Sequence, residues 1–372
     1  MNIAQTHDLY LHVSTDEQTM PLSIKHFTTA LTLAIASIQL SAQTFNNLDI
    51  SSDEGLEILT WNIEWFPKSG STTVGYVKDI IEGIRADMYA IQEIDDTTVF
   101  KNMVNQIDGY HYIMMDGWFG GLVYVYNTET IEILDTYEIY TESQYWSPLP
   151  RSPLVLHFSH QGEEIYAINN HFKCCGDNYI NFNHDGDEEM RRLIASTLIE
   201  EYMREELEGE RVILLGDLND MIDEIEETNV FAPFLNSTDL YWFADMEIAT
   251  GSSSGWSYPT WPSHLDHIMV TDEMFEELNA ESTEVMVIDV AAEMGGWYYY
   301  EQYVSDHRPV AMSMEVLPMS VENPQSATVK TLEGIYDLLG RECLYSQGQI
   351  LIYRYSDGSC ERRISFSASQ PE

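Results

Sequence analysis

Positive charge is scarce in this sequence. The 372 residues include 17 Lys and Arg against 62 Asp and Glu, a formal net charge of −45. Proteins that bind polyanions through surface charge usually carry a basic patch or stripe, and none is visible here. The composition therefore argues against nucleic-acid recognition by a broadly basic surface. Such acidity is typical of a solvated surface adapted to salt, and it also suits the recruitment of divalent cations.

Cysteine is also rare. The chain has four cysteines and no Cys-x-x-Cys pair, which excludes the usual structural zinc site. Cys343 and Cys360 flank a short hairpin-like segment and can pair in an oxidising compartment. The adjacent Cys174 and Cys175 are typical of two packed thiols, with a strained vicinal disulfide as the alternative. A metal role for them together with His171 is a poor fit.

Long apolar runs are absent apart from Phe27–Leu40, which is too short to span a bilayer comfortably. Lys25 precedes it, and Ala42 follows at a position suited to cleavage, so the pattern is typical of a signal peptide. Acidic residues before Met20 do not suit such a peptide, and we expect translation to start at Met20. The alternative is a buried apolar helix. No other stretch resembles a membrane span, and we expect a secreted or cell-surface protein.

The remaining chain alternates strand-like and helix-like segments. The strand around LEILTWNIEW places Ile58, Thr60 and Asn62 on one face, and residues 187–208 form the clearest helix. Strand pairs turn at Asn127–Thr130 and at Gln161–Gly162. Hairpins mixed with helices predict the α/β (α+β) class, as a four-layer α/β/β/α sandwich of two mostly antiparallel sheets, with a small β module at the C-terminus.

The pattern also predicts domain boundaries. We expect a signal-peptide region over 1–43, a linker over 44–55, a catalytic domain over 56–317, a second linker over 318–324 and a C-terminal module over 325–372.

Polar residues cluster repeatedly just beyond strand ends. Loops at strand ends are where folds expose catalytic groups on a fixed backbone. Seven such clusters predict one shared site at one edge of the sheets. They contain Asn62, Glu93, Arg151, His171, Asp217 with Asn219, Asp266, and Asp306 with His307.

These residue types suit the hydrolysis of phosphate esters. Carboxylate and amide oxygens are the hard ligands that Mg²⁺ prefers, with water and substrate phosphate completing its shell. The reaction also needs a positioned water, neutralised phosphate oxygens and help for the leaving oxygen. A histidine held by a carboxylate, a second histidine and an arginine can supply these.

The segments TWNIEW, IQEI, R-S-P, NNHF, GDLND, LDHI and SDHRP resemble, in order, the signatures of the endonuclease/exonuclease/phosphatase superfamily. The resemblance runs from Leu56 to Val316. His171 and Arg151 make it closest to the deoxyribonuclease-like branch. It implies a metal-dependent hydrolase of phosphate esters with Mg²⁺ as the cofactor, Mn²⁺ and Ca²⁺ being the alternatives.

The resemblance implies a metal-binding set and a phosphate contact. Asn62 and Glu93 look like the metal-binding pair, with Glu93 as the principal ligand, and Asp306 looks like a second ligand. Arg151 resembles the arginine that contacts the substrate phosphate. Read alone, Asn62 could simply hydrogen-bond at a strand end, and Arg151 could form a surface ion pair.

The resemblance also implies catalytic roles. Asp217 looks like the residue that positions or deprotonates the attacking water, with Asn219 orienting water or phosphate. His307 looks like the acid/base histidine, and Asp266 like the carboxylate that fixes its tautomer. His171 looks like a second histidine of the site. The next histidine in LDHI faces away on a strand and is expected to be packed or exposed, not catalytic.

Two features bear on the substrate. Gly121 stands where deoxyribonuclease carries a groove-reading tyrosine, which weakens the case for duplex DNA. The aromatic loop over residues 293–304 precedes Asp306, where it could stack on bases, sit in a lipid interface or pack against a neighbouring loop.

The C-terminal segments IYDLLGRE, LIYRYSDG and ERRISF resemble the sorting domain of the type IX secretion system. The resemblance implies that the secretion machinery is a partner and that residues beyond about Gln325 do not contribute to catalysis. The alternative is an ordinary β-hairpin tail.

The leading functional prediction is a secreted, monomeric, metal-dependent phosphodiesterase, an endonuclease acting on DNA or RNA. The alternative is a phosphatase or a sphingomyelinase-type phospholipase C acting on a small or lipid phosphate. A binding module that has lost catalysis is hard to sustain, because no expected metal or acid/base position is missing.

Any nuclease activity of this chain should fall less steeply with salt than that of a basic nuclease, because a protein with few cations releases few counterions on binding. Rates on plasmid DNA over a series of salt concentrations, measured beside a basic nuclease, check this. An equally steep decline for both enzymes would contradict it.

Overall fold

The computed structural model describes residues 45–115 and 121–318, together with 332–337, 341, 343, 350–356 and 360–364 of the C-terminal part. The expected signal peptide, the expected start at Met20 and all but the first residue of the linker expected over 318–324 lie outside the described residues. Within the described residues, no helix combines the length and the apolarity needed to cross a bilayer.

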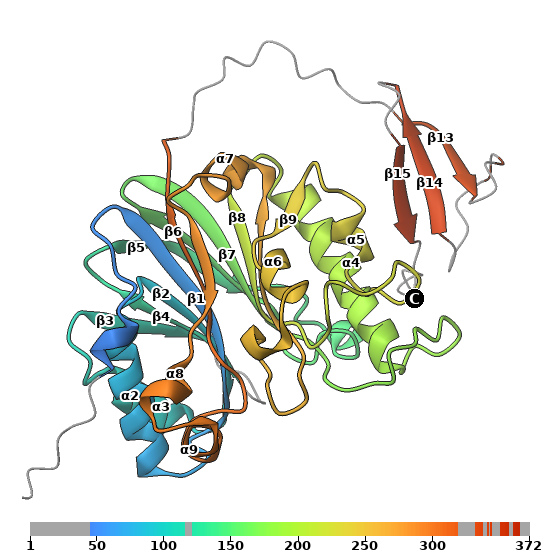
Figure 1. Cartoon of the computed structure of the whole chain (residues 1–372). Helices are drawn as coiled ribbons and strands as arrows, with labels where there is room; N and C mark the ends of the chain where they lie inside the picture. Colours follow the sequence, from blue (N-terminus) through green and yellow to red (C-terminus); the bar gives the residue numbers. More distant parts are fainter. Residues whose placement is uncertain are drawn as a thin grey trace, which may run out of the picture. The chain divides into compact units, whose positions relative to one another are not determined.

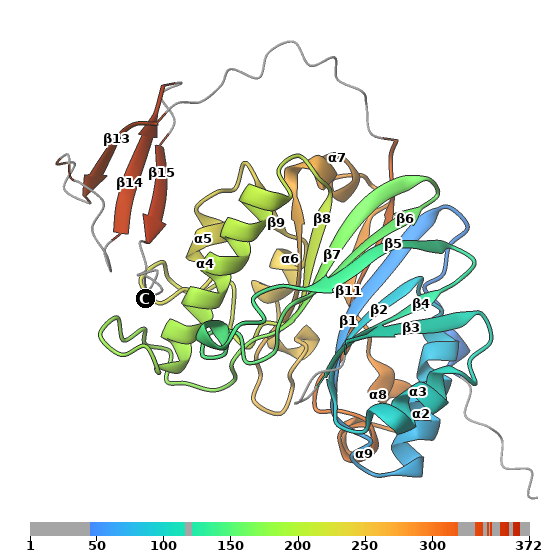
Figure 2. The same cartoon turned by 180° about the vertical axis from the view of Figure 1, so that it is seen from behind.

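Two six-stranded sheets form the centre of the fold (Figures 1 and 2). Each has one parallel pair, β1–β2 in the first sheet and β7–β8 in the second, and its other pairs are antiparallel. The prediction of two mostly antiparallel sheets is confirmed. The first sheet runs β11 (Glu284–Val287), β12 (Val310–Glu315), β1 (Gly55–Phe66), β2 (Met88–Ile94), β4 (Gly121–Asn127), β3 (Tyr110–Met114). The second runs β5 (Ile131–Glu138), β6 (Leu154–His160), β7 (Glu163–His171), β8 (Val212–Asp217), β10 (Asp266–Thr271), β9 (Tyr241–Phe243).

Helices cover the outer face of each sheet, which completes the predicted four layers (Figures 1 and 2). The first sheet carries α2 (Ser71–Ile84), α3 (Thr97–Val104), α8 (Val290–Glu293) and α9 (Trp297–Tyr303). The second carries α4 (Glu188–Glu206) and α5 (Ala232–Leu235). Short elements in the loops are η1 (Asn46–Leu48), η2 (Ser143–Tyr145), α6 (Met246–Ala249), η3 (Ser253–Gly255), η4 (Asp272–Met274) and α7 (Phe275–Leu278).

Strand periodicity divides the interior into three apolar layers. Successive side chains of a strand point to opposite faces, so a strand buried on both sides feeds two cores. In β1, Leu56 and Ile58 face the other sheet, whereas Leu59, Trp61 and Ile63 pack under the helices. Apolar residues of β1 therefore point to both of its faces, because both are buried.

The strands β4 and β5 do not form a hairpin. The sequence predicts two strands joined by a polar turn at Asn127–Thr130, and the turn exists, but β4 lies in the first sheet and β5 in the second. The chain crosses between the sheets there. Both segments have the composition of strands, and the polar turn between them does not distinguish a turn within one sheet from a crossing between two. The predicted pair β6–β7, turning at Gln161–Gly162, is a hairpin.

The segment expected as a linker over 44–55 packs on the first sheet's helical layer. Phe45 is 1% exposed within that core, and it lies so close to Gly83 of α2 that a Cβ there would meet the Phe45 Cβ at 2.4 Å. The amide of Ile50 donates to the Ile84 carbonyl at 3.0 Å. These residues belong to the folded domain and are not a free connection.

The C-terminal part contains a small antiparallel sheet, as the sequence predicts. Its strands are β13 (Leu332–Asp337), β14 (Ile350–Tyr355) and β15 (Cys360–Ile364). Cys343, which the sequence suggests could pair with Cys360, is a free thiol in this structure.

The inner faces of the two sheets become polar at one edge. Along β1 the inward positions change from Ile58 to Thr60 and Asn62, and along β2 from Ala90 to Gln92. Gln92 Nε2 donates to Thr60 Oγ1 at 3.1 Å and, across the sheets, to Asn169 Oδ1 at 2.8 Å. Because buried polar groups require partners, this layer fixes the separation and register of the two sheets where the apolar core ends.

A buried ion pair lies behind β10, on the side away from the first sheet. His267 Nδ1 donates to Asp245 Oδ2 at 2.6 Å, and its Nε2 donates to the Asp220 carbonyl at 2.9 Å. Both ring nitrogens face acceptors, which favours the imidazolium. Burial lowers the pKa of His267, but Asp245 raises it by more, so the net pKa is above the ordinary value. Burial raises the pKa of Asp245, and His267 and His264 lower it below the ordinary value.

The Asp245→Asn substitution should lower the free energy of unfolding by about 3 kcal/mol, the scale on which one partner of a buried pair is lost. The raised pKa of His267 gives stability that is full below about pH 6.5 and is lost as the pH rises through the folded-state pKa. The lowered pKa of Asp245 gives stability that is present above about pH 3.9 and is lost as the pH falls through its folded-state pKa.

The difference between wild type and variant should therefore be largest between about pH 4 and 6.5 and shrink in alkaline buffer. Urea unfolding across that range measures it. A difference that grew with rising pH would show that the pair is not ionic.

Candidate active site

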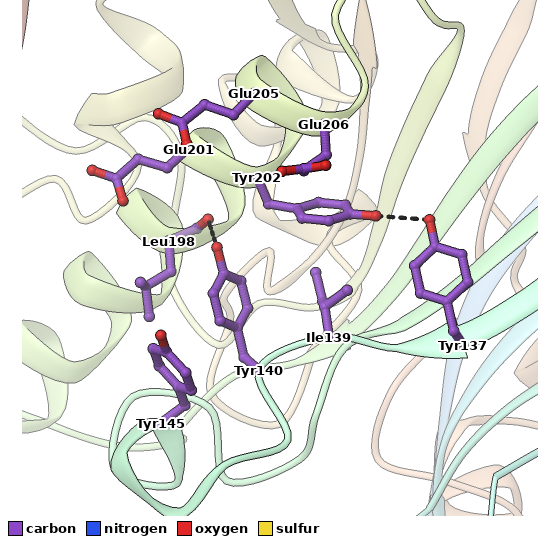
Figure 3. Close-up of a pocket in the computed structure, with 9 residues that line it drawn as sticks. All are labelled: Tyr137, Ile139, Tyr140, Tyr145, Leu198, Glu201, Tyr202, Glu205 and Glu206. Carbon is purple, nitrogen blue, oxygen red and sulfur yellow. Dashed lines mark hydrogen bonds between the residues drawn. The ribbon is translucent and has the colours of Figure 1, made fainter. Parts of the chain in front are cut away.

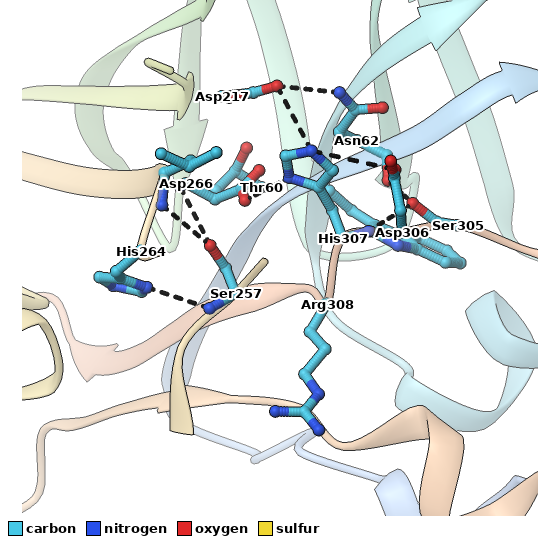
Figure 4. Close-up of polar contacts among 12 residues, drawn as sticks. Thr60, Asn62, Asp217, Ser257, His264, Asp266, Ser305, Asp306, His307 and Arg308 are labelled. Atoms are coloured by element: carbon cyan, nitrogen blue, oxygen red, sulfur yellow. Dashed lines mark hydrogen bonds and ion pairs between the residues drawn. The ribbon is translucent and has the colours of Figure 1, made fainter. Parts of the chain in front are cut away.

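The nine predicted site residues lie at one edge of the sandwich, where the inner sheet faces turn polar. Three end strands or follow them directly in the second sheet, and the rest come from β1, β2, the start of β10 and the turns before β6 and β12. Figure 4 shows Asn62, Asp217, Asp266, Asp306 and His307 drawn together from both sheets.

His307 is paired with Asp266. Its Nδ1 donates to Asp266 Oδ2 at 2.7 Å, and both side chains are buried. Burial lowers the pKa of His307, but Asp266 and then Asp217 raise it by more, and the net pKa lies well above the ordinary value. The bond to Asp266 fixes which nitrogen faces inward, so Nε2 points to the cluster, 3.8 Å from Asp217 Oδ2.

Asp217 joins the two sheets. Its Oδ2 accepts from Asn62 Nδ2 at 2.9 Å, across the gap between β8 and β1, and its Oδ1 accepts from the Asn219 amide at 3.1 Å. Burial raises the pKa of Asp217 to about 7, with Asp266 adding to the effect and His307 opposing it. A carboxyl that titrates near neutrality can accept a proton in a reaction at that pH.

The backbone geometry at Gly216 explains why the GDLND segment begins with glycine. Its φ is +150°, and a Cβ at this position would lie 2.0 Å from the Asn170 carbonyl oxygen of the neighbouring strand. Only glycine permits β7 and β8 to approach this closely just before Asp217. The same approach brings His171 opposite Asp217 in the parallel register.

His171 stands between two carboxylates. Its Nε2 is 3.5 Å from Asp217 Oδ2 and 3.7 Å from Glu93 Oε1. Burial lowers the pKa of His171 well below its ordinary value, and the positive charges of Arg151 and His307 lower it further. The two histidines of the site therefore differ in charge, with His307 cationic and His171 neutral.

Glu93 reaches the site through a break in β2. Strand alternation turns Gln92 inward and would turn Glu93 outward, but Glu93 adopts φ +66° and the pairing with β4 shifts register there. This irregularity redirects the side chain towards His171. Glu93 Oε2 accepts from the Trp65 amide at 3.1 Å. A non-glycine residue in this conformation stores strain of a kind that clusters at functional sites.

Asp306 and Arg151 lie at the margins of the cluster. Asp306 Oδ1 is 4.0 Å from His307 Nε2, and its side chain keeps 28% exposure. Burial lowers the pKa of Arg151, while the charges of Glu93 and Asp217 oppose that shift, so this guanidinium feels both carboxylates. Arg308 points away from His307 in Figure 4, and it donates to the Ser254 carbonyl instead.

The structure thus brings together all nine residues that the sequence nominates. His267 faces the opposite side of β10 and packs against Phe231 and Phe243, as strand alternation predicts. Cys174 and Cys175, expected as packed thiols, are instead exposed and form no disulfide, and Cys175 Sγ donates a hydrogen bond to Cys174 Sγ at 3.0 Å. They lie in the loop after β7, where no core is available to cover them.

Several supporting residues were not predicted. Ser257 Oγ accepts from the amides of Leu265 and Asp266, and its carbonyl accepts from the Arg308 amide at 2.8 Å, which ties the strand of Asp266 to the turn of His307 (Figure 4). Ser305 Oγ donates to the Asn62 carbonyl at 2.6 Å. Each is a single serine in a loop, and only its tertiary neighbours reveal its role.

The donor set fits a divalent cation. The carboxylates of Glu93, Asp217 and Asp266 lie in one largely buried cluster, and the raised pKa of Asp217 reflects burial first and then this surplus of negative charge. Asn62 pairs with Gln92 in the sheet, so its amide lies one residue from Glu93. Glu93 with Asn62, and Asp306 beyond them, could hold the ion through hard oxygen ligands.

A separate hollow of about 610 Å³ lies between the end of β5 and α4 (Figure 3). Tyrosines and glutamates line it, but the Tyr140 hydroxyl donates to the Leu198 carbonyl, and those of Tyr137 and Tyr202 bond to each other at 2.7 Å. It lacks a histidine, a cation or an uncommitted nucleophile among its lining residues, and it is not the site of hydrolysis.

Comparison with known structures supports the fold. The chain is similar to TDP2 of D. rerio complexed with a single-strand DNA product (13% identity, TM-score 0.52, covering 71% of this chain and 100% of that one). It is also similar to the human Nocturnin catalytic domain with bound sulfate (13%, 0.51, 70% and 94%) and to an endonuclease/exonuclease/phosphatase from Bacteroides vulgatus (17%, 0.50, 71% and 99%). At these identities the likeness shows the fold alone.

Comparison with curated protein sequences gives no match. The model of the Endonuclease/Exonuclease/phosphatase family, in contrast, matches residues 59–307, which is more than half of the chain and contains all nine site residues. The chain therefore belongs to the endonuclease/exonuclease/phosphatase family and is a hydrolase of phosphate ester bonds.

Proposed function

We propose that this chain is a divalent-metal-dependent phosphodiesterase that acts as an endonuclease on nucleic acid, with Mg²⁺ as its ion. The observation that carries the proposal is the pairing of a cationic histidine, His307 on Asp266, with a buried carboxyl of near-neutral pKa, Asp217, 3.8 Å away. Hydrolysis of a phosphate ester requires a base that activates the attacking water and a cation that stabilises charge on the phosphate oxygens.

Glu93, Asn62 and Asp306 would hold the ion. When bound, Mg²⁺ neutralises charge on the phosphate oxygens. Asp217 Oδ2 positions the attacking water and accepts its proton, since its pKa of about 7 makes it a base at neutral pH. Asn219, two residues after Asp217 in the loop, orients the same water or a phosphate oxygen.

His307 presents an Nε2–H to the phosphate. Asp266 keeps Nδ1 protonated, so Nε2 is the nitrogen that contacts substrate and can give a proton to the leaving oxygen. His171 is neutral and can accept or donate one hydrogen bond in the same space. Arg151 adds a fixed positive charge beside Glu93 and Asp217. A substrate phosphate bound there would contact few other cations, so this guanidinium would contribute much of the attraction.

One observation favours a second candidate, a phosphatase or a phospholipase C of the sphingomyelinase type. The net charge of −45 repels a polyanion but not a small or zwitterionic phosphate. The neighbour in complex with single-strand DNA supports the nuclease reading, as do His171 and Arg151, the features of the deoxyribonuclease-like branch.

We also propose that the protein acts outside the cell as a monomer. The apolar run Phe27–Leu40 supports export, and the C-terminal motifs support delivery through the type IX secretion machinery to the medium or cell surface. Residues beyond about Gln325 would then serve transport and not catalysis.

Turnover should require the ion. We expect purified protein to cleave plasmid DNA, RNA or bis-p-nitrophenyl phosphate with Mg²⁺ present and to lose that activity in EDTA, because the carboxylates alone repel the substrate phosphate. Release of nucleotides or of p-nitrophenol measures it. Activity undiminished by EDTA would defeat the metal claim, and hydrolysis of sphingomyelin alone would make the second candidate correct.

The Glu93→Ala and His307→Ala substitutions should each lower kcat by about 10³-fold, because the first removes the principal ligand of the ion and the second removes the acid that contacts the phosphate. His184→Ala, an exposed histidine of the loop before α4, is the matched control and should keep full activity. Circular dichroism checks that all three variants fold. Equal rates for His184→Ala and His307→Ala would remove His307 from the mechanism.

The Asp266→Asn substitution preserves shape but not charge. We expect kcat to fall by about 10²–10⁴-fold, because the amide no longer supports the protonated Nδ1 of His307. Arg151→Ala should act more mildly, mainly raising KM. An unchanged rate for Asp266→Asn would contradict the orienting role of this carboxylate.

A further inference from the structure

Four exposed aromatic side chains form a wall beside the proposed active site. Trp65 is 45% exposed, Trp261 75%, Tyr298 68% and Tyr299 51%. Exposing large apolar rings to water is unfavourable and calls for an explanation when several gather on one surface. We call these four residues the aromatic wall.

Hydrogen bonds join the three segments that carry the wall. Thr260 Oγ1 donates to Glu301 Oε1 at 2.7 Å and accepts from Trp297 Nε1 at 3.3 Å, which fastens the loop of Trp261 to α9. Ser69 Oγ donates to the Gln302 carbonyl at 3.0 Å, which fastens the loop after β1 to the same helix. The three segments that carry the rings are therefore joined to one another.

The wall begins at the reacting groups. Tyr258 starts the hairpin that carries Trp261, and its ring lies 4.9 Å from the ring of His307. The Trp65 amide donates to Glu93 Oε2 at 3.1 Å. Trp65 and the residue before it have φ of +51° and +36°, a conformation that bends the end of β1. A group bound at His307 would have the wall as its neighbour.

The chemistry of the wall favours a flat, neutral ligand. All its exposed large apolar side chains are aromatic, whereas the exposed aliphatic ones, Leu134, Ile225 and Leu240, lie on other segments. Polar groups lie on the same segments, because Glu64 pairs with Lys68 and Glu301 accepts from Thr260. Acyl chains would have to cover these groups. A nucleobase, with a neutral π face and polar edges, can stack on the rings without that penalty.

The cations near the wall have partners there, Lys68 with Glu64 and Arg308 with the Ser254 carbonyl, and further cations lie by the second sheet. Arg151 precedes β6 and is electrostatically coupled to Arg191 of α4, while Lys173 follows His171 in the loop after β7. These elements belong to the second sheet, whereas β1 and α9 belong to the first. A strand crossing the site can thus place its phosphates towards Arg151 and its bases towards the wall.

We propose that the aromatic wall stacks an unpaired nucleobase next to the scissile phosphate and so selects single-stranded nucleic acid. This inference rests on the proposed nuclease function and narrows its substrate class. In a duplex the faces of the bases stack on one another and are not available to protein rings, so a paired substrate gains little from the wall.

The test compares Trp261→Ala with Trp242→Ala. Trp242 is also exposed, at 46%, but lies on β9 opposite Val270, four residues along β10 from Asp266. We expect Trp261→Ala to raise KM for a single-stranded oligonucleotide by about tenfold, within the range set by loss of one base–aromatic stack. Trp261→Phe should restore most of the affinity, and Trp242→Ala should match wild type. All three should hydrolyse an abasic oligonucleotide at the wild-type rate, since it has the phosphodiester backbone but no base to stack.

A binding measurement independent of turnover uses the inactive His307→Ala protein with Mg²⁺. Fluorescence anisotropy should show a labelled single strand bound more tightly than the same sequence as a duplex, with the preference lost when Trp261→Ala is added. An unchanged KM for Trp261→Ala, equal binding of both forms, or an effect of Trp261→Ala on sphingomyelin vesicles in place of oligonucleotides would overturn the inference. Hydrolysis of bis-p-nitrophenyl phosphate with no cleavage of any oligonucleotide would end both this inference and the nuclease proposal, leaving the phosphoesterase intact.

Discussion

The face-to-face packing of two sheets, closed at one edge by hydrogen bonds between polar side chains, is the constraint on which the rest depends. Apolar residues fill the space between the sheets until Gln92 meets Asn169 and Asn62 meets Asp217, and from there the inner faces are polar. Since an unpaired polar group at this depth is costly, each of these contacts requires the others. The site is the polar end of the central core, and its geometry is as fixed as the core itself.

Burial and neighbouring charges set the pKa values of the ionisable groups in this polar region. Three carboxylates share it, and the two histidines respond in opposite ways, His307 towards the charged form and His171 towards the neutral one. The difference arises from position: Asp266 lies 2.7 Å from His307, whereas burial outweighs the more distant carboxylates around His171. In a protein with 17 Lys and Arg among 372 residues, the raised pKa of His307 favours a positive charge at the site in addition to that of Arg151.

Local irregularity completes the arrangement. Regular strands would turn Glu93 away from His171, and the left-handed backbone of Glu93 and of Trp65 reverses this at the ends of two neighbouring strands. The same bend exposes the Trp65 ring and makes its amide a donor to Glu93. Strain, the candidate metal ligand and the start of the aromatic wall therefore have one structural origin, the interrupted pairing at this edge.

The sequence by itself determined the strand periodicity, the four-layer class and the nine candidate residues that meet at one edge, because alternating burial and polar strand ends are local patterns that survive without tertiary knowledge. It did not determine that β4 and β5 belong to different sheets, that Phe45 closes a core, or that Ser257 and Ser305 brace Asp266 and Asn62. Those facts depend on which segments meet across the sandwich. A turn, a single serine or an apolar residue in a polar stretch has the same local pattern whichever neighbour it finds, and only the folded chain selects that neighbour.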